Sequence, residues 1–298
     1  MIAWLLTLPA ALAAPPFAVV LGVAQDAGHP QAGCERSCCA AAWADPAKGH
    51  LAASLGIVDP DTGERWLIDA TPDFPAQLRA LTRAAGGPGL TGVLLTHAHM
   101  GHYTGLVHLG REAMGADGVP VYAMPRMRGY LASAGPWDQL VRLENIALRD
   151  LTAGEPVALN ARLTVTPLLV PHRDEYSETV GYVVRGPERS VFYLPDIDKW
   201  DRWDTPIESV IAGVDRAWLD GTFYAGAELP GRDMATIPHP FVVESLTRLG
   251  PLPAAERAKV HFLHLNHSNP LLDTTSDAYD HVTEAGFGIA AEGDRFEL

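Results

Sequence analysis

A cluster of histidines directly after a short apolar run limits the possible architectures more than anything else in the sequence. The run 93–95 is followed at once by Thr96-His97-Ala98-His99-Met100-Gly101-His102. Side chains two positions apart on an extended segment point the same way, so His97 and His99 should face one side. His102 should follow as the next helix begins. Because neutral imidazole is the commonest ligand of zinc and related ions, the cluster predicts a metal site at the end of a buried strand.

Short apolar runs rich in β-branched residues recur along the chain and predict strands. They cover residues 17–23, 54–59, 65–69, 92–96, 119–122, 163–169, 179–184, 190–194, 216–219 and 260–264. Helical periodicity appears at 73–84, 104–114, 125–134 and 240–249. Because helices and strands are interspersed from end to end without a linker or a repeat, we expect a single layered α/β domain over residues 15–298.

The composition excludes several classes of protein. With 47% apolar and 19% charged residues, the chain is not a disordered one. A balance of 22 Lys and Arg against 36 Asp and Glu, or −14, argues against general nucleic-acid binding, which needs an excess of basic residues. No stretch reaches the ~18 apolar residues that a membrane helix needs. We therefore expect a small-molecule substrate, and the oligomeric state stays open.

The first 14 residues resemble a secretory signal peptide. A short apolar run ends in the small-residue segment Ala11-Leu12-Ala13, which fits a cleavage site near Ala13. This predicts export to the periplasm or the extracellular space. The run has no preceding Lys or Arg, however, and the alternative is a first buried strand of a cytoplasmic protein.

Further metal ligands should come from the ends of other strands, because a rigid scaffold must hold them. His172 follows one apolar run, Asp196 follows another, and His264 ends a third. The histidine at 261 lies earlier in that last strand and is expected to be structural. Asp198 and Glu175 lie near proposed ligands and either could supply a carboxylate, although both are expected to be solvated.

The order His97-x-His99-x-x-His102, His172, Asp196, His264 resembles the metallo-β-lactamase fold superfamily over about residues 17–290. Within it, the segments 25–34, 69–73, 219–223 and 237–239 are similar to the branch that contains the pyrroloquinoline quinone biosynthesis proteins. The resemblance implies an α/β fold, a four-layer αβ/βα sandwich with a metal cleft at one edge of two packed sheets.

The resemblance also implies two sets of metal ligands. One ion would be held by His97, His99 and His172, and the second by His102 and His264, with Asp196 bridging the two. The superfamily loop normally reads His-x-His-x-Asp-His, and Gly101 stands here in place of the aspartate. Its loss leaves either a mononuclear centre or a second ion held by fewer ligands. Zinc is expected, with iron or manganese as alternatives, because imidazole and carboxylate suit all three.

Three cysteines, Cys34, Cys38 and Cys39, lie within six residues. Similar relatives carry a structural zinc on N-terminal cysteines closed by a histidine three residues after the last catalytic one, which is His267 here. The spacing Cys-x3-Cys-Cys departs from the relatives' Cys-x-Cys-x2-Cys, and a disulfide from Cys34 to Cys38 or Cys39 is the alternative that export would favour. Strand alternation should turn His264 and His267 to opposite faces.

These residues predict a metal-dependent hydrolase of a phosphodiester or another ester-like bond. The resemblance implies that Asp196 is the bridging carboxylate. It also implies that His239, at the start of a predicted helix, protonates the leaving oxygen, as a histidine in a similar place does in nuclease and phosphodiesterase relatives; the alternative is a solvated histidine at a helix start. An iron-dependent redox enzyme of the pyrroloquinoline quinone biosynthesis type and a non-catalytic, metal-binding relic of the fold are the alternatives. The histidine loop is expected at the surface, so that removing His97 or His99 should leave the fold intact.

Overall fold

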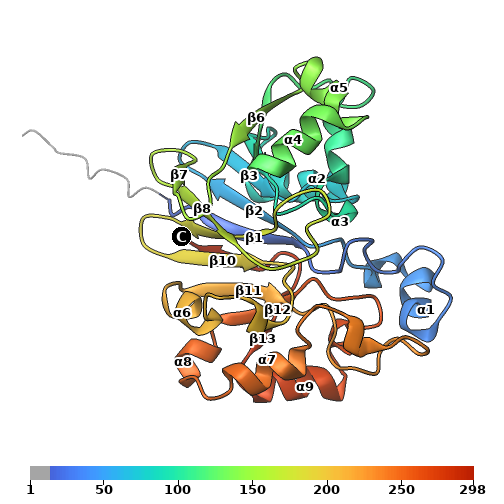
Figure 1. The fold of residues 1–298 in the computed structure, drawn as a ribbon. Coiled ribbons are helices and arrows are strands. Elements are labelled where there is room, and N and C mark those ends of the chain that lie inside the picture. The colour runs from blue at the N-terminus through green and yellow to red at the C-terminus, as the bar shows by residue number, and fades with distance from the viewer. Residues whose placement is uncertain (1–13) are drawn as a thin grey trace, which may run out of the picture.

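The computed structural model describes residues 14–298, and within them two seven-stranded sheets face each other (Figure 1). The first sheet, in spatial order, consists of β14 (Arg295–Glu297), β1 (Phe17–Gly22), β2 (Ser54–Asp59), β3 (Glu64–Ile68), β4 (Gly92–Leu94), β5 (Val119–Ala123) and β6 (Ile146–Asp150). The second consists of β13 (Gly288–Ile289), β12 (Val260–Leu263), β11 (Arg216–Asp220), β10 (Ser190–Leu194), β9 (Val180–Arg185), β8 (Thr164–Leu169) and β7 (Val157–Ala158).

Helices cover the outer face of each sheet, as Figure 1 shows. Above the first sheet lie α2 (Phe74–Ala84), α3 (Met100–Tyr103), α4 (Pro125–Ser133) and α5 (Trp137–Arg142), and α1 (Ser37–Ala44) lies to one side. Below the second lie α6 (Ile207–Ala212), α7 (Val242–Leu249), α8 (Ala254–Arg257) and α9 (Asp277–Glu284). The order helix, sheet, sheet, helix confirms the predicted four-layer αβ/βα sandwich.

The core explains why the strands read as continuous apolar runs. All six residues of β1 are buried, and their side chains alternate between two clusters. Ala18 and Val20 pack between the two sheets, whereas Phe17, Val19 and Leu21 pack under the helices of the first sheet. A strand that is buried on both faces shows no polar alternation.

The ten predicted strands are present with ends shifted by at most two residues. The predicted helix 104–114 is wrong: a 3-10 turn over Thr104–Leu109 stands in its place. Gly105 and Gly110 lower the helical propensity of this segment, and a side chain at Gly105 would collide with the carbonyl of Thr71. The elements α1, α5, α6, α8, α9, β6, β7, β13 and β14 were not predicted.

The proposed signal peptide lies outside the described residues except for its last one, so export stays a prediction. Among residues 14–298, none of the helices has the length and apolar character needed to cross a bilayer.

Strand direction brings the site together. In the first sheet β3, β4, β5 and β6 run parallel, and in the second β10, β11, β12 and β13 do. The carboxyl ends of parallel strands meet at one edge, where open α/β sheets place their ligands. The residues that leave these ends are Asp69 after β3, His97 after β4, Asp196 after β10, Thr222 after β11 and His264 after β12.

Candidate metal centre

Asp196 is the centre of a buried cluster of imidazoles. Its Oδ2 lies 2.9 Å from His102 Nε2, 3.3 Å from His264 Nε2 and 3.5 Å from His97 Nε2. Its Oδ1 lies 3.6 Å from His172 Nε2. The carboxylate therefore faces both predicted ligand sets, which is the position that a bridging ligand needs. Burial alone would raise the pKa of Asp196, but the imidazoles, His264 and His172 foremost, hold it well below its ordinary value.

The residues of this cluster fit divalent metal ions. The Nε2 atoms of His97, His172 and His264 are buried and lack a hydrogen-bond partner. Such orphaned atoms cost free energy, and all three surround one carboxylate, an arrangement that a metal ion would complete. Burial holds the pKa of His97 well below its ordinary value, which keeps the ring neutral and ready to bind metal.

Asp69 orients one histidine of each ligand set. His102 donates from Nδ1 to Asp69 Oδ2 over 2.8 Å. His97 donates from Nδ1 to Thr96 Oγ1 over 3.0 Å, and that hydroxyl in turn donates to Asp69 over 2.9 Å. Because Nδ1 of each ring donates to a fixed acceptor, Nε2 is the nitrogen that is left to bind a metal ion.

Asp220 orients two further histidines, His264 and His239, in the other half of the molecule. His264 donates from Nδ1 to Thr222 Oγ1 over 2.9 Å, and the hydroxyl donates to Asp220 Oδ1 over 2.7 Å. Asp220 Oδ2 accepts from His239 Nδ1 over 2.7 Å. Burial alone would lower the pKa of His239, but Asp220 raises it to about 9. The structure thus brings His239 into the cluster, 3.4 Å from Asp196 Oδ1.

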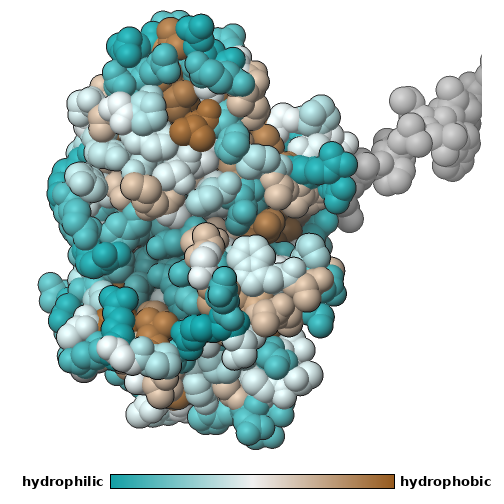
Figure 2. Space-filling view, turned by 90° about the vertical axis from the view of Figure 1, so that its right-hand side faces the viewer, coloured by the Kyte–Doolittle hydropathy of each residue, from teal (hydrophilic) through white to brown (hydrophobic). Residues whose placement is uncertain are grey.

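The two carboxylates near the first ligand set are positioning groups. Asp198 Oδ1 lies 3.3 Å from His172 Nδ1, and Glu175 Oε2 accepts from His99 Nε2 over 2.9 Å. Neither takes the place of the aspartate missing at 101. His99 is the outermost of the predicted ligands, and Met100 beside it is 71% exposed. Figure 2 views the side of α1 and α3, which is hollowed and largely hydrophilic around the hollow.

Asp26, on the loop after β1, lies beside the second predicted ligand set. Its Oδ1 lies 3.1 Å from His102 Nε2 and 3.6 Å from His264 Nε2. Together with Asp196 these residues offer ligand atoms that all lie within 4.8 Å of one another. The sequence prediction missed Asp26, although it singled out the segment 25–34. No sequence pattern indicates that this loop packs against the histidines. The prediction likewise missed the orienting residues Thr96, Asp69, Asp220 and Thr222.

The expectation of a surface histidine loop is wrong. His97 and His102 are each only 1% exposed. The segment before β9 covers the loop, since Ser177 Oγ accepts from the backbone N–H of Ala98 over 2.8 Å. Replacing His97 therefore perturbs a buried position rather than a free loop.

The cysteine cluster is assembled as the zinc prediction requires. Cys34, Cys38, Cys39 and His267 offer ligand atoms within 4.8 Å of one another, and His267 Nδ1 is buried without a partner. The three cysteines are free thiols, with Cys34 Sγ 3.8 Å from Cys38 Sγ. The reason for the separation of His264 and His267 differs from the prediction: β12 ends at Leu263, and the chain turns at His264, whose φ is 63°.

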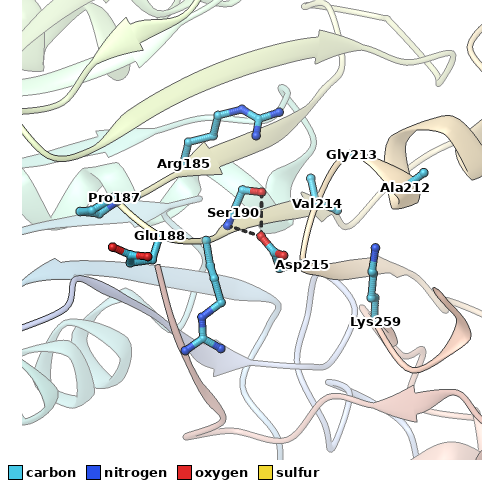
Figure 3. Close-up of a pocket in the computed structure, with 11 residues that line it drawn as sticks. Arg185, Pro187, Glu188, Ser190, Ala212, Gly213, Val214, Asp215 and Lys259 are labelled. Atoms are coloured by element: carbon cyan, nitrogen blue, oxygen red, sulfur yellow. Dashed lines mark hydrogen bonds between the residues drawn. The ribbon is translucent and has the colours of Figure 1, made fainter. Parts of the chain in front are cut away.

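Two other features lie away from this centre. His261 lies against Arg216, consistent with a structural role. A polar pocket of about 300 Å³ lies at the opposite end of β10, where Asp215 accepts from the backbone and hydroxyl of Ser190 (Figure 3). Arg185 and Lys259 also line it, and it contains none of the metal-centre residues.

Comparison with known proteins agrees with this geometry. Residues 64–267 match the beta-lactamase superfamily domain, and the chain belongs to this superfamily. Within it, the chain resembles the coenzyme PQQ synthesis proteins B. It is 29% identical to that of Methylobacterium nodulans, covering 93% of this chain and 98% of the relative. It is 26% identical to that of Xanthomonas oryzae pv. oryzae, covering 92% and 97%.

Solved structures show the same fold. Zinc-bound PqqB from Methylobacterium extorquens superposes with a TM-score of 0.79 at 23% identity, covering 95% of this chain and all of that one (100%). A diphosphatase from the PhnP family superposes with a TM-score of 0.68 at 23% identity, covering 96% and 98%. The matched domain includes the predicted histidines but not the loop of Asp26.

Proposed function

We propose that this chain is a dinuclear metal-dependent hydrolase that cleaves a phosphodiester or a related ester-like bond in a small molecule. The observation that carries the proposal is the convergence of the unpartnered Nε2 atoms of His97, His172 and His264 on Asp196. Bound divalent ions would lower the pKa of a coordinated water to ~7 and polarise the bond under attack. Zinc is the expected ion, with manganese or iron as alternatives.

The chain's own residues divide into two ligand sets and one shared carboxylate. The first set comprises His97, His99 and His172, the second comprises Asp26, His102 and His264, and Asp196 faces both. A separate structural zinc is proposed at Cys34, Cys38, Cys39 and His267. Imidazole, carboxylate and thiolate are the ligand types that zinc prefers.

His239 is the proposed proton donor to the leaving oxygen. Asp220 holds its Nδ1, which leaves the Nε2–H of the imidazolium as the proton to be given away. A pKa near 9 keeps the ring charged at neutral pH. Asp196 beside the ring adds a second anionic neighbour. This pairing of a charged histidine with a metal cluster supports hydrolysis of a bond whose leaving group needs protonation.

Turnover by the metal-loaded protein tests the proposal. We expect zinc- or manganese-loaded protein to cleave phosphodiesters, compared in one panel with carboxylic esters, lactones and thioesters. His239→Ala should slow a diester with an alkoxide leaving group far more than bis(p-nitrophenyl) phosphate, because p-nitrophenolate leaves without a proton. Equal slowing of both substrates would contradict the role of His239, and no metal-dependent hydrolysis of any substrate would contradict the proposed class.

A second candidate is an iron-dependent redox enzyme of the pyrroloquinoline quinone biosynthesis type. It is favoured by the likeness to coenzyme PQQ synthesis protein B over 93% of the chain. Protein purified without added metal separates the two candidates through its metal content and its oxygen consumption with a reductant. Bound iron with oxygen uptake and no hydrolysis would favour the redox enzyme. Metal binding without either activity would favour a non-catalytic relic.

A further inference from the structure

We infer that Asp26 supplies, from a distant loop, the carboxylate ligand that the histidine loop lacks at position 101. The inference rests on the metal centre of the proposed function but not on the reaction that it performs. Gly101 is then not a lost ligand. Because Gly101 has no side chain, it leaves the space that the side chain of Asp26 occupies.

The loop of Asp26 is anchored against the second ligand set. Gln25 donates its backbone N–H to the carbonyl of Leu265 over 2.8 Å, next to His264, and Gly28 closes a turn by donating to the carbonyl of Gln25 over 2.8 Å. This turn directs Asp26 Oδ1 between the Nε2 atoms of His102 and His264. The carboxylate is therefore held where it meets two imidazoles, rather than reaching them from a free loop.

The side chain of Asp26 occupies the place of a side chain at 101. A Cβ added to Gly101 would lie 2.3 Å from Asp26 Oδ1, 2.3 Å from its Cα and 2.7 Å from its Cβ. Atoms in a packed interior cannot approach so closely. Gly101 lies in α3 and is not among the glycines with positive φ, so its backbone conformation does not demand glycine. Glycine at 101 is therefore required sterically, because the side chain of Asp26 occupies the space that a side chain at 101 would need.

Charge balance agrees with this reading. With Asp26, the second ligand set has an anionic ligand of its own beside two imidazoles, in addition to the carboxylate of Asp196 that faces both sets. Buried charge is costly unless it is compensated, and without Asp26 the second ion would have no carboxylate of its own, only a share of Asp196. Four other carboxylates near the site are already hydrogen-bonded to histidines: Asp198 and Glu175 to the first set, Asp69 to His102 and Asp220 to His239.

Metal binding by a set of five proteins tests the inference: the unaltered chain, Asp26→Asn, Gly101→Asp, the double variant Asp26→Gly with Gly101→Asp, and a matched double variant Asp26→Gly with Gly101→Asn. Each protein is depleted of metal and titrated with zinc against a chromophoric chelator, and cobalt spectra report the coordination. Asp26→Asn keeps the shape and removes the charge, and should weaken one cleft ion by at least about tenfold, the lower end of the loss for merely orienting partners.

The two Gly101 variants distinguish relocation from a simple contact. Gly101→Asp alone should lower the melting temperature without strengthening metal binding, because its side chain enters occupied space. The double variant should recover the second ion, and a matched double variant with asparagine at 101 should not. If the double variants fail to fold, Asp26→Asn alone decides.

Unchanged affinity for every ion in Asp26→Asn would overturn the inference, even if hydrolysis is confirmed. So would tighter metal binding by Gly101→Asp without loss of stability. Loss of one ion in Asp26→Asn would support it even if no hydrolysis is ever detected, so the two proposals fail separately.

Discussion

Replacing Asp69 by asparagine should weaken metal binding while leaving the fold largely intact. Asp69 is fully buried after β3, and its carboxylate accepts hydrogen bonds from three donors. They come from the backbone N–H of Thr96 over 2.8 Å, from its hydroxyl over 2.9 Å and from His102 Nδ1 over 2.8 Å. Asparagine keeps the shape but offers one acceptor oxygen and one donor NH2 group.

The asparagine should also change the tautomer of His102. The Asn Oδ1 can still accept from Thr96, which directs the NH2 group towards His102 Nδ1. The ring must then accept at Nδ1 and carry its proton on Nε2, the atom that faces Asp196 and Asp26. A hydrogen bond to a charged partner contributes about 1.5–3 kcal/mol. At ~1.4 kcal/mol per decade, affinity for the second ion should fall roughly 10- to 100-fold.

The assay is a zinc titration of the metal-depleted protein against a chelator of known affinity, with a melting curve for each sample. Asp73→Asn is a matched control, because it lies in the same segment and its Oδ2 accepts from the backbone of Ala52 over 2.8 Å. Wild-type zinc affinity in Asp69→Asn would refute the reasoning. A collapse of the melting temperature in both variants would show that the segment, and not the tautomer, was perturbed.

Three further predictions concern the opposite half of the site and the thiols. Asp220→Asn should lower the pKa of His239 from about 9, so the basic limb of the pH–rate profile should move to lower pH; an unmoved limb would exclude His239 as the acid. His264→Ala should lower turnover, whereas His267→Ala should lower the melting temperature and the zinc content, because a structural zinc contributes folding free energy. Equal melting temperatures of the two variants would contradict separate sites. Asp69 raises the pKa of His102 well above its ordinary value although burial opposes this, so zinc must displace a proton there. Affinity should therefore rise with pH and the binding enthalpy should vary with the buffer; no dependence on either would contradict a charged His102.

The sequence predicts several ligands of the metal centre because they follow apolar runs. His97 leaves β4 and Asp196 leaves β10, and the parallel directions of the strands bring those ends to one edge. The same signal identified His264 after β12. Strand ends can be read from hydrophobicity, so residues placed by them can be predicted.

The residues that act on those ligands could not be found in this way. Asp69 and Asp220 also follow or end strands, but a lone aspartate there is typical of many solvated turns. Their burial, and the threonines that connect them to His97 and His264, depend on packing between distant segments. Asp26 depends on the approach of the loop after β1 to α3, which no local pattern encodes.

In both halves of the site, a buried aspartate orients two histidines. Asp69 and Asp220 each accept one histidine Nδ1–H directly, and each reaches a second histidine through a threonine hydroxyl. Within residues 14–298, the ion-pair partners of these carboxylates and of Asp196 are imidazoles rather than lysine or arginine. Buried carboxylates need compensating positive charge, and imidazoles can provide it in two ways, by holding protons or by binding metal ions. Protons and metal ions therefore compete for the same Nε2 atoms. The buried aspartates that orient the rings also set the pH above which metal ions displace the protons.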